Sequence, residues 1–397
     1  MSINKDNLNR ITEGQPNKVD PHGILARIML AFLTTAGIFY INIMPAVVSG
    51  LKEALAFTNQ QAGFVSSANL YGAALGALAA VFLIKRISWR SWSYILLITL
   101  IAIDTSCMFI ESPEVMIAVR FIHGLVGGLL VGIGFGIISR TNEADKTFGY
   151  LLFIQWGLGG LGLMYLPELV PSFGISALFI SLIAFTLVTL VMMPFIPHYA
   201  IEDIEVVDNK DTTIKRIPLA LNLFGIFLFQ AANMGLFAYM IGLGKISGLT
   251  IQFMSPALAL ASWIALFGAF LVIIIGTKFG RTIPLCASIL ITAIASWVLH
   301  YSESEQIYLV ANIIIGVTWA FTLPYMFGIC SELDKAGQLA ALGGFASKMG
   351  LATGPMVGAL LLSGDNYALV INVAALALIV CTVVIFMPAR LLDSKRS

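Results

Sequence analysis

The chain has 397 residues, of which 59% are hydrophobic and 11% are charged, and its formal net charge is +1. Soluble domains carry charge on about a quarter of their residues, so this composition, with a mean hydropathy of +0.93, excludes an ordinary soluble fold and predicts an integral membrane protein. The balanced charge gives no sign of a nucleic-acid partner, and nothing in the composition calls for a cofactor.

Residues 1–23 are polar, and we expect them to form a cytoplasmic tail. The first apolar run starts at Ile24 and is about 25 residues long, which exceeds the roughly 7–15 apolar residues of a cleavable signal peptide. This run is therefore predicted to be the first membrane span.

Eleven more apolar runs follow, each close to the roughly 20 residues that cross a hydrocarbon core of about 30 Å. Backbone groups in lipid must be paired within their own segment, so each run is predicted to be a helix. The twelve predicted spans are residues 24–48, 61–84, 92–110, 116–138, 147–167, 175–195, 218–241, 253–276, 283–300, 307–330, 339–362 and 367–388. The four cysteines lie inside these spans, so we expect neither a disulfide framework nor a metal site.

The distribution of lysine and arginine predicts the orientation of the spans. With the N-terminus inside, eighteen of the 22 basic residues fall in cytoplasmic segments, and the outer loops keep only Lys52 and Lys245. We therefore expect a multi-pass protein of a bacterial inner membrane with both termini in the cytoplasm.

The chain divides into two related halves. Residues 198–217 are the longest internal polar stretch and are predicted to be a cytoplasmic linker between bundles at 24–197 and 218–388, with a tail at 389–397. The halves align without a gap at an offset of 192 residues. Gly50-Leu51 matches Gly242-Leu243, and Phe135-Gly136-Ile137 matches Phe327-Gly328-Ile329. The sequence therefore predicts an all-α membrane fold of twelve helices in two pseudo-symmetric six-helix bundles, and we expect a monomer.

In each half, a glycine-rich segment at the end of the second span runs into a basic loop. The residues of the two copies are Gly76, Lys85, Arg86 and Arg90 in the first, and Gly268, Lys278, Gly280 and Arg281 in the second. With the segment RFIHGLVGG, which starts at Arg120, these motifs make the chain resemble the major facilitator superfamily over residues 24–390. The resemblance implies a gating role for the loops. Lys85 and Thr277 stand where the family has an acid that helps to latch the two bundles.

A further family pattern, G-x-x-x-G-P-x-x-G, belongs to the fifth span of drug/proton antiporters. In this chain it lies in the eleventh predicted span, from Gly350 to Gly358. This position argues against an antiporter of that group.

Four ionisable residues are predicted to lie at membrane depth, where each needs a partner or a wet cavity. Asp104 and Arg120 lie at similar depths below the outer face on consecutive helices, which predicts a salt bridge. The pair is either a structural tie or, as the family resemblance implies for Arg120, part of proton coupling. His123 is either a titrating neighbour or a packing residue, and Lys348 either faces a cavity or pairs with an acid.

Further polar and aromatic residues are candidates for a substrate pocket, since the resemblance implies that spans one, four, seven and ten line a cavity. The alternative for each is ordinary packing. These candidates are Tyr40, Asn42, Gln155, Trp156, Gln230, Asn233, Tyr239, Trp319 and Tyr325.

The function predicted from the sequence is secondary active transport of a small organic solute by alternating access, coupled to protons, with a preference for an organic anion such as a carboxylate. The chain has no G-x-x-x-x-G-K-[ST] loop for ATP, so a gradient must supply the energy. Efflux of amphipathic compounds is the alternative substrate class. A non-transporting sensor is the alternative of another class, although the polar segments are short for a signalling domain, and no motif of an intramembrane enzyme is present.

Overall fold

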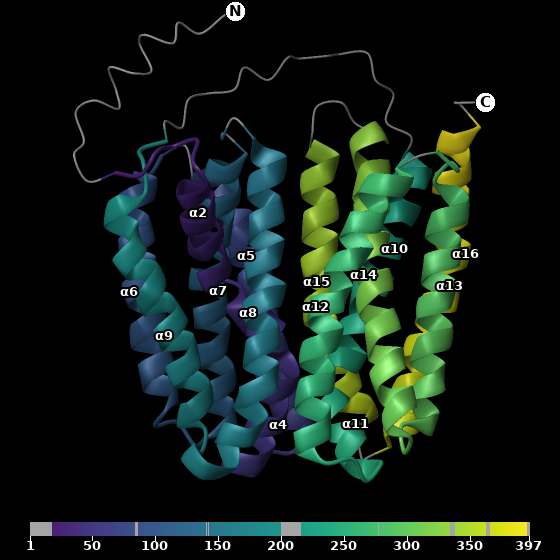
Figure 1. Ribbon diagram of the computed structural model, residues 1–397, viewed down its shortest axis with the longest axis horizontal. Helices are drawn as coiled ribbons and strands as arrows, with labels where there is room; N and C mark the ends of the chain where they lie inside the picture. Colours follow the sequence, from purple (N-terminus) through teal and green to yellow (C-terminus); the bar gives the residue numbers. More distant parts are fainter. Residues whose placement is uncertain are drawn as a thin grey trace, which may run out of the picture.

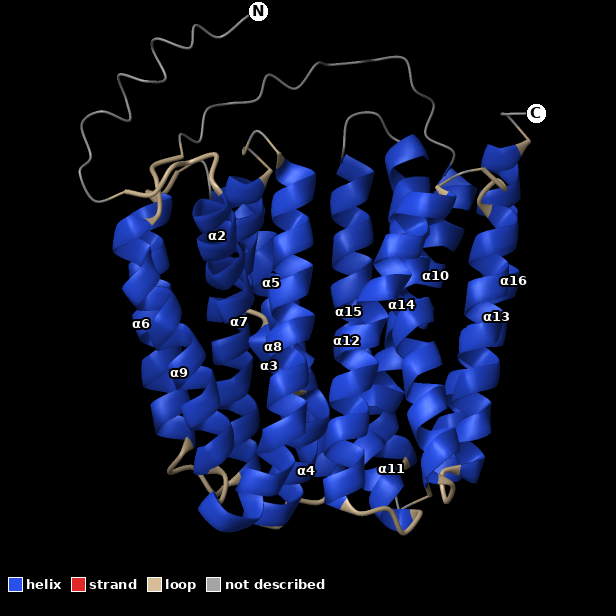
Figure 2. Ribbon diagram, in the orientation of Figure 1, coloured by secondary structure: helices blue, strands red, loops and turns tan. Residues whose placement is uncertain are grey.

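The computed structural model describes residues 18–83, 86–139, 141, 143–199, 216–276, 278–333, 338–362 and 366–394. In this part of the chain, Figure 2 shows helices joined by short loops, with no strand. Most of the predicted N-terminal tail, residues 200–215 of the predicted linker and the last three residues lie outside the described residues.

The helices follow the predicted spans in order. The first half contains α2 (Ile24–Ala36), α3 (Phe39–Asn42), α4 (Met44–Leu55), α5 (Asn59–Leu83), α6 (Trp89–Cys107), α7 (Pro113–Ile138), α8 (Ala144–Phe173), α9 (Ser176–Met192) and the turn η1 (Met193–Phe195). The second half contains α10 (Arg216–Phe237), α11 (Met240–Ile246), α12 (Ile251–Ile275), α13 (Thr282–Val298), the turn η2 (Leu299–Tyr301), α14 (Glu305–Leu333), α15 (Gln338–Leu361) and α16 (Tyr367–Asp393).

The first and seventh spans are interrupted, which the apolar pattern did not predict. In the first span the chain breaks after Ala36 and again at Ile43, and Pro45 is the second residue of the helix that follows. Proline has no N–H and its ring clashes with the carbonyl four residues earlier, so an unbroken helix is disfavoured there. The seventh span breaks between Phe237 and Met240. Both breaks leave a short helix, α4 or α11, at the same end of the molecule (Figure 1).

The described residues form two bundles that stand side by side, α2–α9 in one and α10–α16 in the other (Figure 1). The bundles meet where α5 packs on α15, α8 on α12, and α4 on α11. The start of α2 and the end of α16 lie at one face, and α4 and α11 lie at the opposite face.

Matched glycines give the two bundles the same internal packing. A Cβ on Gly76 of α5 would lie 2.0 Å from the carbonyl oxygen of Leu125 in α7, and a Cβ on Gly268 of α12 would lie 2.0 Å from that of Val317 in α14. Both members of these contacts are related by the 192-residue offset, so the internal repeat in the sequence is also a repeat in helix packing. Small residues at such crossings let backbones approach closely, as in membrane helix pairs.

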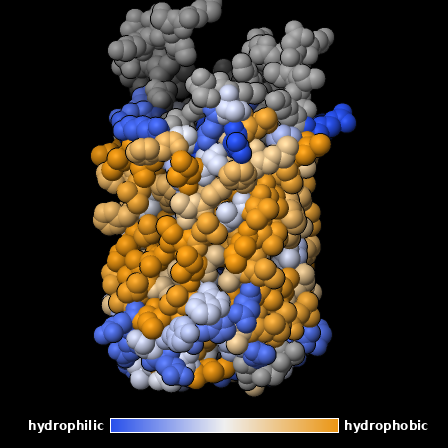
Figure 3. Space-filling model, turned by 90° about the vertical axis from the view of Figure 1, so that its right-hand side faces the viewer, coloured by the Kyte–Doolittle hydropathy of each residue, from blue (hydrophilic) through white to orange (hydrophobic). Residues whose placement is uncertain are grey.

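The surface is that of a membrane protein. Figure 3 shows an apolar band between two hydrophilic ends, and large side chains such as Ile273, Val383 and Phe270 are exposed. Nine helices of the described part are long and apolar enough to cross a membrane by themselves. The other three predicted spans are the interrupted first one, α6 and α15.

Candidate functional site

A buried ion pair joins α6 to α7 inside the first bundle. Arg120 Nη1 donates to Asp104 Oδ1 at 2.6 Å, and the two side chains are 0% and 1% exposed. The salt bridge predicted from their equal depth is therefore present. Two opposite charges removed from water each lose hydration, so the pair is tolerated only because each compensates the other.

His123 and Asn69 extend this pair into a chain of hydrogen bonds. His123 Nε2 lies 3.3 Å from Asp104 Oδ1, and its Nδ1 lies 2.9 Å from the side-chain nitrogen of Asn69. The same Asn69 nitrogen donates to the backbone carbonyl of Arg120 at 3.1 Å. A carbonyl only accepts, so the Asn69 amide must present its NH₂ group here, and His123 Nδ1 must be the acceptor. His123 is then neutral, with its proton on Nε2 directed at Asp104.

Aromatic rings complete the enclosure of Arg120. The guanidinium carbon lies 4.3 Å from the ring centroid of Tyr40 and 5.7 Å from that of Phe179. Among the described residues, Arg120 Nε and Nη2 have no hydrogen-bond partner, and the guanidinium charge is held by Asp104 and the cation–π contacts. Arg120 and His123 are both buried, with 0% and 5% of their surfaces exposed.

A second polar cluster lies in the other bundle. Gln230 of α10 donates to Ser347 of α15 at 2.6 Å and accepts from the indole N–H of Trp319 in α14 at 2.6 Å. These two hydrogen bonds set the orientation of the Gln230 side-chain amide, and they bring together two of the predicted pocket residues, Gln230 and Trp319.

Lys348 follows Ser347 and turns toward the first bundle. Its Nζ lies 5.9 Å from the ring centroid of Phe135 in α7, and the residue is only partly buried. Within the described part of the chain, no carboxylate pairs with it. Of the two arrangements predicted for Lys348, the ion pair is therefore not found among the described residues.

The remaining pocket candidates are dispersed. Asn42 is partly buried with its Cβ against Gly159, while Gln155 is buried and Trp156 partly buried in α8. Asn233 donates to the carbonyl of Phe229 in its own helix.

Two tyrosines among the candidates bind backbone carbonyls. The hydroxyl of Tyr239 donates to Pro355 at 2.7 Å, and that of Tyr325 donates to Gly276 at 2.6 Å. These hydroxyls tie helices together within the second bundle, and neither joins the Gln230 cluster.

Three contacts between the bundles were not predicted from the sequence. The indole of Trp263 in α12 donates to the carbonyl of Gly157 in α8 at 3.0 Å. The hydroxyls of Tyr71 in α5 and Thr353 in α15 lie 2.8 Å apart, and Lys245 of α11 forms an ion pair with Glu53 of α4. The sequence does not indicate which residue will contact a glycine carbonyl or a single hydroxyl. The contact between Lys245 and Glu53 could have been predicted, since the two residues have opposite charges and occupy equivalent positions in the repeat.

The second basic loop is anchored by acids from elsewhere in its own bundle. Gly280 has a φ of +70° and its position faces Asp393, whose carboxylate accepts from the backbone N–H groups of Arg281 at 2.8 Å and Thr282 at 2.9 Å. Arg281 Nη2 donates to Glu332 at 2.7 Å. Asp393 and Glu332 thus hold this loop to α16 and α14 of its own bundle, while Thr277 lies outside the described residues.

The first basic loop uses backbone carbonyls instead. Arg90 donates to the carbonyls of Met193 at 3.0 Å and Pro197 at 3.3 Å, just beyond α9. Arg86 is exposed, and Lys85 lies outside the described residues. The two loops therefore share basic character but not partners.

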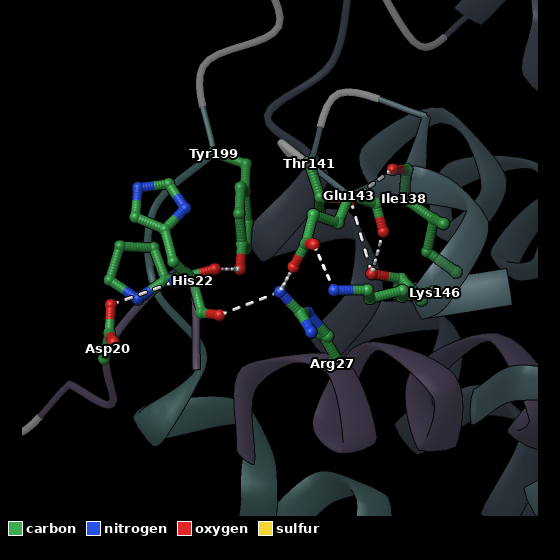
Figure 4. A network of polar contacts seen from close by, with 10 residues as sticks. Asp20, His22, Arg27, Ile138, Thr141, Glu143, Lys146 and Tyr199 are labelled. Carbon is green, nitrogen blue, oxygen red and sulfur yellow. Dashed lines mark hydrogen bonds and ion pairs between the residues drawn. The ribbon is translucent and has the colours of Figure 1, made fainter. Parts of the chain in front are cut away.

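A polar network ties the start of α2 to the start of α8 at the same face. In Figure 4, Arg27 and Lys146 point toward Glu143, with which both form ion pairs. The hydrogen bond from Lys146 and the charge of Arg27 hold the pKa of Glu143 below its ordinary value. Nearby, Tyr199 donates to the carbonyl of Pro21 at 3.0 Å, and burial raises the pKa of Tyr199 to about 12.

Comparisons with known proteins agree with this architecture. The family model described as Major Facilitator Superfamily matches residues 28–355. A crystal structure of a mutant of the nucleoside transporter NupG is similar with a TM-score of 0.73 and 14% identity, covering 92% of this chain and 99% of that chain. A second NupG crystal structure gives a TM-score of 0.72 and 14% identity, covering 92% and 98%. At this identity the likeness is one of fold. No curated protein sequence matches the chain significantly.

Proposed function

This chain belongs to the major facilitator superfamily, and we propose that it is a secondary active transporter that carries a small organic solute by alternating access of its two bundles. The observation that carries the proposal is the pairing of two repeated bundles along α5–α15 and α8–α12. Two rigid halves joined mainly through such helix contacts can rock about a site between them.

The substrate class we propose is a small organic anion with a carboxylate. Lys348 supports this choice, because it is a cation at membrane depth, at the junction of the bundles, without a carboxylate partner in the described part of the chain. The fixed amide of Gln230 and the indole of Trp319 lie on neighbouring helices and offer directional contacts. We assign Arg120 and His123 to energy coupling and not to substrate binding, since both side chains are buried.

For energy coupling we propose protons, with Asp104, Arg120, His123 and Asn69 as the coupling cluster. The support comes from the chemistry of the cluster, in which the Asp104 carboxylate contacts the His123 imidazole, and Nδ1 of that imidazole carries no proton. Loss of the bond from Asn69 would let His123 accept a proton, so a helix movement that separates α5 from α7 would change the charge of the cluster.

We further propose the setting of the protein: a monomer in a bacterial inner membrane, with bundles at residues 24–197 and 218–388 and both termini in the cytoplasm. The excess of lysine and arginine at the face that carries the start of α2 and the end of α16 supports this orientation.

Flux into proteoliposomes tests the proposal. The full-length chain is reconstituted and offered labelled acetate, benzoate and succinate, a nucleoside, and a cationic amphiphile, each with and without an inward proton gradient. We expect uptake of at least one carboxylate, enhanced by the gradient. Uptake of the nucleoside or the amphiphile alone would contradict the anion assignment, and absence of any flux would contradict transport of these classes.

A further inference from the structure

An ion pair marks the axis that relates the two bundles. Lys245 of α11 and Glu53 of α4 pair at the face opposite the start of α2 (Figure 1). Their separation in the chain is 192 residues, which is the offset of the internal repeat. Two positions related by a twofold axis contact each other only if both lie close to that axis. The pair therefore lies on the pseudo-twofold axis, where the outer ends of the bundles meet.

The opposite charges at this position set whether the bundles can close. Two identical halves would bring like charges together on the axis, and like charges repel. Here one half supplies Glu53 and the other Lys245, so the contact is attractive, and Ser49 also donates a hydrogen bond to Glu53. Lys245 and Glu53 keep 36% and 29% of their side chains exposed. Water and salt screen such a pair, so it holds the bundles only weakly.

A cavity of about 230 Å³ opens beside this pair. Its walls come from α4, from the break between α10 and α11, from α11 itself, and from the start of α16, and they include Val48, Lys52, Glu53, Tyr239, Lys245 and Tyr367. The charged residues of the lining are two lysines and one glutamate, so the lining has a net positive charge. Pockets for drug-sized ligands have volumes of about 300–1,000 Å³, so this one suits a smaller molecule.

We propose that this cavity is an outer docking site for a small organic anion, whose carboxylate replaces Glu53 at Lys245 and so releases the outer ends of the bundles. The proposal rests on the anion transport proposed above. In this exchange the carboxylate of the anion takes the place of the Glu53 carboxylate at the Lys245 ammonium group. The ion pair between Glu53 and Lys245 permits the exchange because it is exposed and therefore weak. Once displaced, the Glu53 carboxylate faces the bound anion, and their repulsion separates α4 from α11.

The test follows opening of the cavity through a cysteine at Val48, which is 2% exposed in its wall. The full-length chain, with the four native cysteines replaced by alanine and with Val48→Cys, is placed in nanodiscs and labelled with a maleimide. We expect acetate, benzoate or succinate to raise the labelling rate at least threefold, and the matching amides to leave it unchanged. Equal acceleration by acid and amide, or none by any acid, would overturn the docking site.

Variants of the pair check that the effect passes through Lys245. Lys245→Gln should label fast without added acid and show no response, and Glu53→Gln should also label fast. The exchanged pair, Glu53→Lys with Lys245→Glu, restores the attraction and should label as slowly as the parent. An undiminished response to acid in Lys245→Gln, or fast labelling of the exchanged pair, would contradict the proposal.

Parallel uptake measurements keep this inference separable from the proposed function. Carboxylate uptake with no labelling response would overturn the docking site and leave anion transport standing. A labelling response without carboxylate uptake would support the docking site and overturn anion transport.

Discussion

At the scale of single residues, Lys348 offers the sharpest test of the proposed substrate class. Its ammonium group has no carboxylate partner within the described residues, so Lys348→Ala removes the charge that we propose for substrate binding. A hydrogen bond to a charged group contributes about 1.5–3 kcal/mol, so we expect the KM for an anionic substrate to rise roughly 10- to 100-fold. Lys348→Arg, which keeps the charge, should retain most of the affinity. Unchanged uptake kinetics in Lys348→Ala would remove this residue from the site.

Asp104 and Arg120 permit a test that separates structure from coupling. Asp104→Asn leaves Arg120 as an unpaired buried charge, which costs about 3–5 kcal/mol, so we expect little folded protein. The double variant Asp104→Asn with Arg120→Gln has no buried charge and should recover folded yield, measured by size-exclusion chromatography. Transport by the double variant that no longer responds to a proton gradient would assign the pair to coupling. A normal response would make the pair purely structural.

The sequence predicts charged partners at this scale better than neutral ones. Asp104 and Arg120 were paired from their depth alone, because two opposite charges in lipid have few alternatives. Asn69 was missed, since its partners are a backbone carbonyl and one histidine nitrogen. Trp263 was missed for the same reason, as its partner is the carbonyl of Gly157. Backbone acceptors exist at every position and so leave no residue pattern.

At the scale of helices, the glycines at equivalent positions predict that the two bundles will be equally destabilised by larger side chains there. A Cβ at Gly76 or Gly268 would lie 2.0 Å from a carbonyl of the facing helix. Overpacking of this kind typically costs about 1–3 kcal/mol or more, so Gly76→Val and Gly268→Val should each lower the thermal unfolding temperature. Gly149 of α8 has open space where a Cβ would point, so Gly149→Val is the control. A similar loss in all three variants would show that helix propensity, and not helix crossing, sets the effect.

The tie between α2 and α8 predicts a dependence on pH. The pKa of Glu143 is depressed from 4.5 by Lys146 and Arg27. Its ionised form is therefore favoured in the folded state, so the tie is complete above pH 4.5 and is lost as the pH falls through the lower, folded-state pKa. The protection of the amides at the start of α2 against hydrogen exchange, corrected for the intrinsic rate at each pH, should fall as the pH drops through that lowered pKa. Glu143→Gln should show low protection at every pH, and a parent-like pH profile in that variant would place the effect elsewhere.

The helix boundaries show which parts of an element the sequence specifies. Helices lie at all twelve predicted apolar runs, because lipid requires an apolar run for each crossing, and nine helices of the described part are long and apolar enough to cross by themselves. They did not predict the breaks at Ile43 or after Phe237, because the interrupted stretches are as apolar as the continuous ones. Pro45 was a local signal for the break at Ile43.

At the scale of the whole molecule, the sequence predicts two bundles but not how they meet. The 192-residue repeat and the polar stretch after residue 197 indicate two similar halves. Which faces of α5, α8, α12 and α15 pair depends on contacts between distant neutral residues such as Tyr71 and Thr353. A prediction of alternating access must therefore be tested at this interface.

Bridging the interface should stop transport, whereas bridging within a bundle should not. Tyr71 and Thr353 belong to different bundles, and their hydroxyls lie 2.8 Å apart. Ser288 and Thr322 are a matched pair within the second bundle, also 2.8 Å apart. Each pair is changed to cysteine in a chain without native cysteines and bridged by a short bis-methanethiosulfonate, which forms a disulfide with each thiol by releasing a sulfinate. Because rocking requires the bundles to separate on one side, we expect the Tyr71–Thr353 bridge to abolish uptake until reductant is added. The Ser288–Thr322 bridge should leave uptake intact, since that bundle moves as a unit. Full uptake with the first bridge in place would mean that solute crosses without relative movement of α5 and α15, as in a channel.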